Sequence, residues 1–366
     1  MTQLFETYDL CGIKLKNRFV RSATCENLTT PERLPSEELI REYEKLARGG
    51  VGLIITSATR SDRTWDKREF ETWKRMSIDM DKDIPAFKVL TDRVHALGAK
   101  VAMQLGSFYK FRGDFVAPSP VPYNRAASMT DSSDIVPRSL TVTEIREIIK
   151  KYGEAGGRAK KAGFDAVEIA AAHGFPICQF FSPYYNRRED EYGGNGENRA
   201  RFVVEIVREI KKNAGKDFPV FIKMNVSDFF DGGMTVDDAA EAAGILARNG
   251  MAAIETSGGA LGQKMTQFGH VDASQWEEGY FREYAAIIKS KVNIPIILVG
   301  GLRNPVMMEN AIAQGKTDLV SMSRPLIKEP DIINRWKKGD RRPSDCTSCN
   351  GCLDLLMKGD PVVCVL

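Results

Sequence analysis

The stretch PIILVGGLRNPVMMENAIAQGKTDLVSMSR, residues 295–324, contains two short apolar runs joined by a helix-like segment. Residues 295–301 and 318–324 are rich in Ile, Leu, Val and small residues, as expected for strands buried on both faces. Residues 305–315 between them predict a helix. Because parallel strands need a long crossover connection, the stretch predicts one strand–helix–strand unit of a parallel sheet.

The same pattern extends over the rest of the chain. Six more apolar runs lie at 18–24, 51–58, 100–106, 164–171, 219–227 and 252–259. Helix-like segments lie at 36–49, 84–98, 142–162, 197–213, 236–249 and 280–291, and Thr141 with Glu144 has capping-box spacing before one of them. Eight strands alternating with helices in 366 residues predict a (β/α)8 TIM barrel. The alternative is a doubly wound open sheet, but no G-x-G-x-x-G motif follows the first strand.

Three segments lie outside this alternation. Residues 4–18, LFETYDLCGIKLKNR, predict a small hairpin that could close the barrel floor. Residues 107–141 form a long irregular segment rich in Pro, Ser and Asp, and loops of this length are usually functional. We assign residues 1–336 to the barrel and residues 337–366 to a Cys-rich tail.

The composition excludes several classes of function. The chain has 52 Lys and Arg against 49 Asp and Glu, interspersed, for a net charge of +3. This balance gives no electrostatic reason to expect a nucleic acid or a membrane surface as partner. No signal peptide and no apolar run of about 18 residues is evident. We therefore expect a cytoplasmic protein, in which clustered cysteines more often bind metal or do redox chemistry than form disulfides.

The loops after the last two predicted strands suggest an anion site. Gly300 and Gly301 leave backbone N–H groups open, while Ser323 and Arg324 add a hydroxyl and a guanidinium. In this fold the loops after strands seven and eight commonly bind phosphate. The alternative is a tight glycine turn beside a surface arginine.

Polar residues at other strand ends should meet at the same mouth. Gln104 offers a donor and an acceptor, which suits the pyrimidine edge of a flavin, and Lys223 would stabilise a reduced flavin. Alternatively, Lys223 pairs with a carboxylate such as Asp228 or Glu168. Of three histidines only His173 follows a predicted strand, which makes it the candidate for polarising a substrate oxygen.

These residues resemble the old yellow enzyme family of FMN-dependent oxidoreductases. The most specific part is HGFPICQFFSPYYNRREDEYGG, residues 173–194, and KNRFVRSAT, GLIITSA, MQLG and ILVGGLRNP fall in the family's order. The resemblance covers essentially the whole chain and implies an FMN-binding barrel, with NAD(P)H as a possible reductant. It implies that FMN rests on Ala23, Thr24 and Ala58, with its ring held by Gln104 and Lys223 and its phosphate by Gly301, Ser323 and Arg324.

The tail resembles one branch of that family. Cys346, Cys349, Cys352 and Cys364 give C-x2-C-x2-C-x11-C. This spacing is similar to the [4Fe–4S] segment of the trimethylamine dehydrogenase and 2,4-dienoyl-CoA reductase branch. Zinc and a degenerate tail with free thiols remain alternatives. The resemblance also implies that Cys25 contacts the flavin, as a free thiol that tunes its potential or as a covalent attachment; the plain alternative is a buried, inert cysteine.

The residues that would contact the substrate differ from the family's pattern. The family's pair of carbonyl-binding residues falls at Ala170 and His173, so one donor is missing, and its proton-donating Tyr is Phe175. We expect reduction of an activated C=C bond in an enone or enoyl thioester, with the proton coming from Tyr109, Tyr184 or water.

Two other functions remain open from the sequence. One is an amine or C–C dehydrogenase running in the oxidative direction, and the other is a non-catalytic flavin and iron–sulfur electron-transfer subunit. The partners expected are a small unsaturated carbonyl or amine substrate and an external electron carrier, with a homo-oligomer left open.

Overall fold

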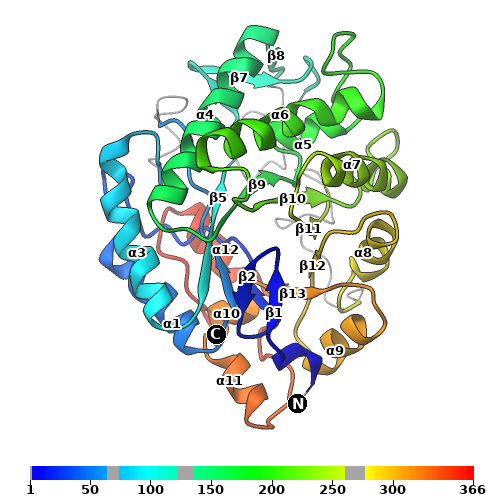
Figure 1. Ribbon diagram of the computed structural model, residues 1–366. Helices are drawn as coiled ribbons and strands as arrows, with labels where there is room; N and C mark the ends of the chain where they lie inside the picture. The colour runs from blue at the N-terminus through cyan, green and yellow to red at the C-terminus, as the bar shows by residue number, and fades with distance from the viewer. Residues whose placement is uncertain (1, 64–73, 107, 123–134, 260–276) are drawn as a thin grey trace.

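The computed structural model describes residues 2–63, 74–106, 108–122, 135–259 and 277–366. Eight parallel strands form a closed barrel in which each strand pairs with the next in chain order (Figure 1). Each predicted apolar run contains one of these strands. They are β3 (Phe19–Arg21), β4 (Leu53–Ile55), β5 (Lys100–Leu105), β9 (Ala166–Ala171), β10 (Val220–Asn225), β11 (Ala253–Ser257), β12 (Ile296–Val299) and β13 (Leu319–Met322).

The seven predicted helices are present around the barrel. Amphipathic patterns explain them, because the buried apolar residues of these helices share one core cluster with apolar residues of the barrel strands. The capping box predicted at Thr141 is formed, because Thr141 accepts from the Glu144 N–H while the Glu144 side chain accepts from the Thr141 N–H. The helices are α1 (Glu37–Arg48), α3 (Ile84–Ala96), α4 (Val142–Lys161), α6 (Gly196–Ala214), α7 (Val236–Arg248), α8 (Arg282–Lys289) and α9 (Pro305–Ala313).

The predicted N-terminal hairpin closes the barrel floor. Strands β1 (Tyr8–Leu10) and β2 (Ile13–Leu15) pair antiparallel. Leu10, Ile13 and Leu15 are buried in one apolar cluster with inward residues of the barrel strands, among them Phe221 and Leu319. The floor is therefore sealed by apolar packing, and the opposite end of the barrel is left for chemistry.

The segment 107–141 differs from the irregular loop expected from the sequence. Within its described part, β6 (Lys110–Phe111), β7 (Asp114–Ala117) and β8 (Arg138–Ser139) form a small sheet. Strands of two to four residues are too short for their periodicity to be recognised in a sequence. Other short elements are η1 (Gln3–Phe5), η2 (Asp81–Asp83), α5 (Pro176–Phe181), α10 (Arg324–Lys328), α11 (Ile332–Lys337) and α12 (Gly351–Met357).

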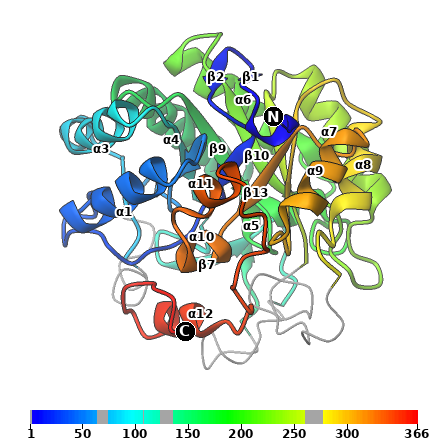
Figure 2. The ribbon, with the colours of Figure 1, turned by 90° about the horizontal axis from the view of Figure 1, so that it is seen from below.

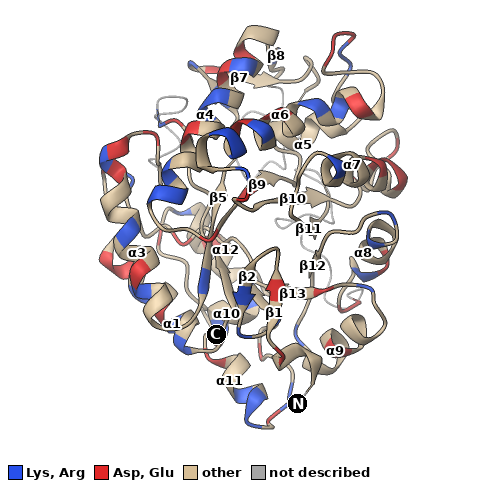
Figure 3. Cartoon of the chain, viewed as in Figure 1, with Lys and Arg blue, Asp and Glu red and all other residues tan. Residues whose placement is uncertain are grey.

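The surface charges follow the sequence expectation. Acidic and basic residues are both spread over the outer helices (Figure 3). None of the helices in the described part of the chain is long and apolar enough to cross a membrane.

Candidate functional site

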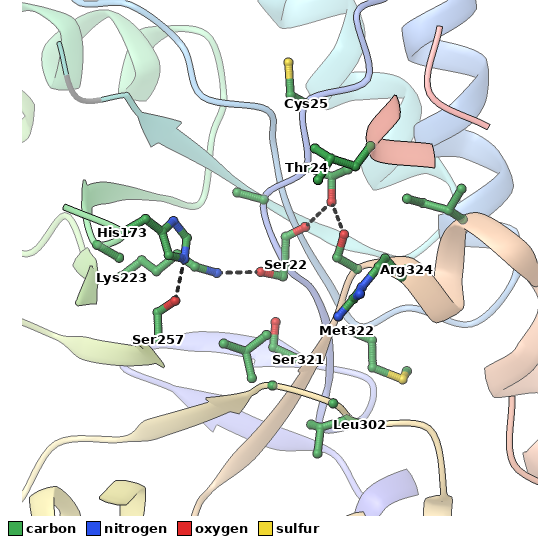
Figure 4. A pocket seen from close by; sticks show the side chains of 18 of the residues that line it. Ser22, Thr24, Cys25, His173, Lys223, Ser257, Leu302, Ser321, Met322 and Arg324 are labelled. Carbon is green, nitrogen blue, oxygen red and sulfur yellow. Dashed lines mark hydrogen bonds between the residues drawn. The ribbon is translucent and has the colours of Figure 1, made fainter. Parts of the chain in front are cut away.

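One cavity lies at the carboxyl ends of the barrel strands (Figure 4). Residues from all eight strands or the loops that follow them line it, because parallel strands all end at the same mouth. The predicted cofactor residues and His173 all meet there. They are Ala23, Thr24, Cys25, Ala58, Gln104, His173, Lys223, Gly300, Gly301, Ser323 and Arg324.

One end of the cavity is suited to an anion. Gly300 and Gly301 have φ angles of 118° and 65°, which favour glycine. A Cβ on Gly300 would lie 2.8 Å from ring atoms of Tyr280 and Phe281. Beside these glycines, the guanidinium of Arg324 lines the cavity and donates a 2.7 Å hydrogen bond to Asn350 Oδ1. Backbone and guanidinium donors therefore converge on one place.

The neighbouring loop after β3 is held against the same end of the cavity. Thr24 Oγ1 lies 2.7 Å from Ser323 Oγ, and Arg21 Nη1 donates to the Ser323 carbonyl at 2.8 Å. These contacts join the first and last strands of the barrel at the cavity wall. The loop that carries Ala23 and Cys25 is thus fixed relative to Arg324.

The middle of the cavity is lined by the ammonium group of Lys223 and the amide of Gln104. Lys223 Nζ donates to Ser22 Oγ at 2.8 Å and to Glu255 Oε2 at 2.9 Å (Figure 4 shows the contact with Ser22). Lys223 thus pairs with a carboxylate, as the alternative interpretation of the sequence expected. The partner is Glu255, however, and neither Asp228 nor Glu168. Gln104 Nε2 donates to Glu168 Oε2 at 2.7 Å, which leaves its carbonyl oxygen as an acceptor for a ligand.

His173 stands across the cavity from the anion-binding end. Its backbone adopts φ 63°, unusual for a residue other than glycine, and its N–H donates to Asn225 Oδ1 at 2.9 Å. Its Nε2 lies 2.6 Å from Ser257 Oγ (Figure 4). Burial, reinforced by the charge of Lys223, lowers the pKa of His173 to about 3. The imidazole is therefore neutral near pH 7 and can donate a hydrogen bond from one nitrogen.

The wall beside His173 carries the residues that depart from the family pattern. Ala170 and Phe175 line the cavity together with Arg75, whose guanidinium lies 6.0 Å from the centre of the Phe175 ring. Cys25 also lines it, and burial raises the pKa of its thiol. A thiol, less nucleophilic than a thiolate, therefore faces the cavity.

The two tyrosines considered as proton donors are not among the described residues that line this cavity. Tyr109 packs behind Phe175, with 4.8 Å between the ring centres. Tyr184 packs against Tyr185 and Phe230.

The Cys-rich tail forms part of the cavity wall. Asn350 and Cys352 line it, as do three apolar residues of the segment 353–362. In Figure 2, α12 lies outside the ring of helices, on the side of α10. Several hydrogen bonds hold the tail there. Among them, Asn27 Nδ2 donates to the Leu356 carbonyl, and the Val362 N–H donates to the Glu26 carbonyl.

The four tail cysteines line a second, smaller cavity next to the first. All are free thiols, and Cys352 and Arg324 line both cavities. Among the described residues, no three His, Cys, Asp or Glu side chains are grouped closely enough to hold a single metal ion. The thiols are thus gathered, but more loosely than a mononuclear zinc site requires. They are Cys346, Cys349, Cys352 and Cys364.

Several residues of the site were not predicted from the sequence. Ser22, Ser257 and Ser321 carry no special pattern, and Arg75 follows no predicted strand. Glu255 had a usable signal, because it is an ionisable residue in the middle of an apolar run. A charged group at such a place must face an internal partner.

Comparison with known proteins identifies the family. The profile of the "NADH:flavin oxidoreductase / NADH oxidase family" matches residues 3–342. The chain belongs to this family. This match confirms the resemblance seen in the sequence. It places the chain among the FMN-dependent oxidoreductases.

Three relatives illustrate the match. NADH oxidase from Thermoanaerobacter brockii is 36% identical over 96% of this chain and 53% of its own length. Cinnamate reductase from Clostridium sporogenes is 32% identical over 99% of this chain and 57% of its own. The structure of histamine dehydrogenase from Rhizobium sp. 4-9 superposes with a TM-score of 0.85 at 26% identity, over 99% of this chain and 52% of that one. The chain thus spans about half the length of these relatives.

The cavity of this family member fits the cofactor that the family implies. The glycine pair with Arg324 suits a phosphate, and Gln104 with Lys223 suits the polar edge of an isoalloxazine ring. A side chain at Gly300 would intrude on the aromatic residues behind it, which explains the glycine there.

Proposed function

We propose that the chain reduces a C=C bond activated by a carbonyl, carboxyl or thioester group, using FMN held in the cavity. The observation that carries this proposal is the placing of His173 in the same cavity as the anion-binding loops and Lys223. Bound FMN would supply hydride chemistry. The names of relatives, such as cinnamate reductase, support an unsaturated acid or its derivative as the substrate class.

His173 would hold the carbonyl oxygen of the substrate. Its low pKa makes it a neutral donor, which stabilises negative charge developing on that oxygen without carrying a charge itself. Ser257, 2.6 Å from Nε2, would fix the orientation of the ring. Lys223, positioned by Ser22 and Glu255, would lie at the polar edge of the flavin and stabilise negative charge there.

The proton would come from a group other than the tyrosine that the family resemblance implies. Phe175 cannot donate a proton, and Ala170 cannot share the carbonyl oxygen with His173. Tyr109 packs against Phe175, which lines the cavity, with 4.8 Å between the ring centres. Tyr109 and water are therefore the donors that the geometry favours, and Tyr184, held in its own aromatic cluster, is less suited.

For the tail we propose a [4Fe–4S] cluster bound by Cys346, Cys349, Cys352 and Cys364. Four free thiols on the wall of one small cavity support this assignment. The thiolate sulfurs of these four residues would hold the cluster, which would supply one-electron chemistry. It would take electrons from an external carrier, and NAD(P)H is the alternative reductant for the flavin.

A substrate screen tests the proposed reaction. Anaerobic protein reduced with dithionite is mixed with an enone, cinnamate or an enoyl thioester, and flavin reoxidation is followed. Oxidised protein is mixed in parallel with secondary and tertiary amines. Reoxidation by an unsaturated substrate supports the proposal. Flavin reduction by an amine would favour the dehydrogenase alternative, suggested by the likeness to histamine dehydrogenase. Reaction with neither class would favour an electron-transfer subunit.

A further inference from the structure

Two glutamates lie inside the barrel beneath the cavity. Glu168 of β9 and Glu255 of β11 are both fully buried. They flank β10, which carries Lys223, and Glu255 is in register with Lys223. An ionised carboxylate without a partner is costly when it is buried. The surroundings of each glutamate therefore indicate which of the two is ionised.

Glu255 is surrounded by donors. Its Oε2 accepts from Lys223 Nζ at 2.9 Å, and its Oε1 accepts from Ser321 Oγ at 2.5 Å. Both oxygens are thus satisfied, one of them by a cation. This is the environment of an ionised carboxylate.

Glu168 has a different environment. Its Oε2 accepts from Gln104 Nε2 at 2.7 Å, whereas no donor reaches its Oε1 among the described residues. The carboxyl group of Glu168 also interacts with that of Glu255, and two ionised carboxylates would repel each other there. No cation pairs with it in the described part of the chain. Burial, followed by the charge of Glu255, raises the pKa of Glu168 well above its usual range, against the opposing influence of Lys223. A proton on this carboxyl group relieves both costs.

We propose that Glu168 and Glu255 together hold one proton, which Glu168 carries. Ionised Glu255 then partly cancels the positive electrostatic potential that Lys223 produces at the flavin. The charges facing one another would then be Lys223 and Glu255, with Glu168 and His173 neutral. The group as a whole is uncharged. The inference rests on the FMN binding proposed above. Glu255 would be a positioning residue, because it acts on the flavin through Lys223 and does not contact the flavin itself.

Two isosteric variants separate the two carboxyl groups. Glu255→Gln removes the negative charge beside Lys223, so reduced flavin should be favoured. Glu168→Gln replaces an already neutral group. The measurement is the redox equilibrium of bound FMN against a reference dye near pH 7. For Glu255→Gln we expect a shift toward reduced flavin of about tenfold or more, or about 30 mV for two electrons. For Glu168→Gln we expect the wild-type value.

An equal shift in both variants, or a larger shift for Glu168→Gln, would overturn the assignment. Infrared spectroscopy gives a second readout that does not need the Glu255 variant to fold. In the difference spectrum of wild type minus Glu168→Gln, recorded at about pH 9 so that Glu26 is ionised, the carbonyl stretch of a protonated, buried carboxyl group should appear. Identical spectra of the two proteins in this region would also overturn the proposal. The same band can be sought in flavin-free protein, so a failure to bind FMN would be recognised separately as a failure of the proposed function.

Discussion

Arg324 and Asn350 join the cofactor cavity to the Cys-rich tail through a 2.7 Å hydrogen bond from the guanidinium to the side-chain carbonyl oxygen. Arg324 begins α10 directly after the last barrel strand, and Asn350 precedes α12. Asn350 is buried and has φ 63°, a conformation that asparagine tolerates better than most residues. The arginine at the proposed phosphate site is therefore held in place by the tail.

Replacing Arg324 should weaken FMN binding. Arg324→Gln removes a charged donor from the proposed phosphate site, at a cost of roughly 1.5–3 kcal/mol in binding free energy. Fluorescence titration of flavin-free protein with FMN measures this. Lys328→Gln is the matched control, because it removes a positive charge from the same short helix without lining the flavin cavity. Unchanged affinity in Arg324→Gln would show that the phosphate binds elsewhere.

Replacing His173 should affect ligands and leave the cofactor in place. His173→Asn keeps a residue that tolerates φ 63° but shortens the donor. The flavin spectrum should be retained, and binding of a phenol, reported by its charge-transfer band over the flavin, should weaken by about tenfold or more. Because the pKa of His173 is about 3, wild-type binding should show no His173 titration between about pH 5 and pH 8. A step in that range that disappears in His173→Asn would contradict the neutral imidazole.

Restoring the family's tyrosine should increase ene reduction. Phe175 lines the cavity, and its ring centre is 6.4 Å from that of His173. Phe175→Tyr places a phenol there, and a general acid typically contributes about 10²–10⁴-fold in rate. Stopped-flow reoxidation of reduced flavin by a simple enone measures the gain, with Phe175→Leu as control. If Tyr109 already supplies the proton, Tyr109→Phe should slow the wild type and leave Phe175→Tyr little changed.

Glu26 should make stability depend on pH. This buried carboxyl group lies 3.4 Å from Arg21 and accepts from the Tyr43 hydroxyl. Burial outweighs the charge of Arg21 and raises the pKa of Glu26 from 4.5 to about 7. The folded state therefore binds a proton that the unfolded state has lost above about pH 4.5. Stability from this group is present below that pH and is lost as the pH rises to about 7, by roughly 3 kcal/mol.

Thermal unfolding from pH 5 to pH 8 tests this dependence. Glu26→Gln should lose stability less steeply than wild type over that range, whatever its absolute stability. Exposed Glu38 in α1 offers the control, and Glu38→Gln should keep the wild-type slope. Parallel curves for wild type and Glu26→Gln would rule out the shifted pKa.

The sequence predicted the barrel because its strands are apolar runs separated by amphipathic helices, and that signal is local. It also predicted which strand ends would meet, since a closed parallel barrel brings them to one mouth. It could not reveal the contacts that depend on packing between distant segments. Glu255 as the partner of Lys223 and Asn350 as the partner of Arg324 both required the three-dimensional register. The small sheet of β6, β7 and β8 was missed because its strands are too short to show a period.

The tail cysteines should hold an iron–sulfur cluster beside the flavin. All four line one small cavity, the turn after α12 brings Cys364 back to the other three, and Cys352 lines the flavin cavity as well. Anaerobically purified protein should contain about four iron and four acid-labile sulfide per chain. Cys349→Ser should abolish both while retaining most of the FMN, because Cys349 is not among the residues that line the flavin cavity. Cys11→Ser is the control, since Cys11 is exposed on the hairpin at the opposite end of the barrel. One zinc ion and no iron would make the tail structural. Neither metal would leave four free thiols, and electrons would then have to reach the flavin directly from a soluble reductant such as NAD(P)H.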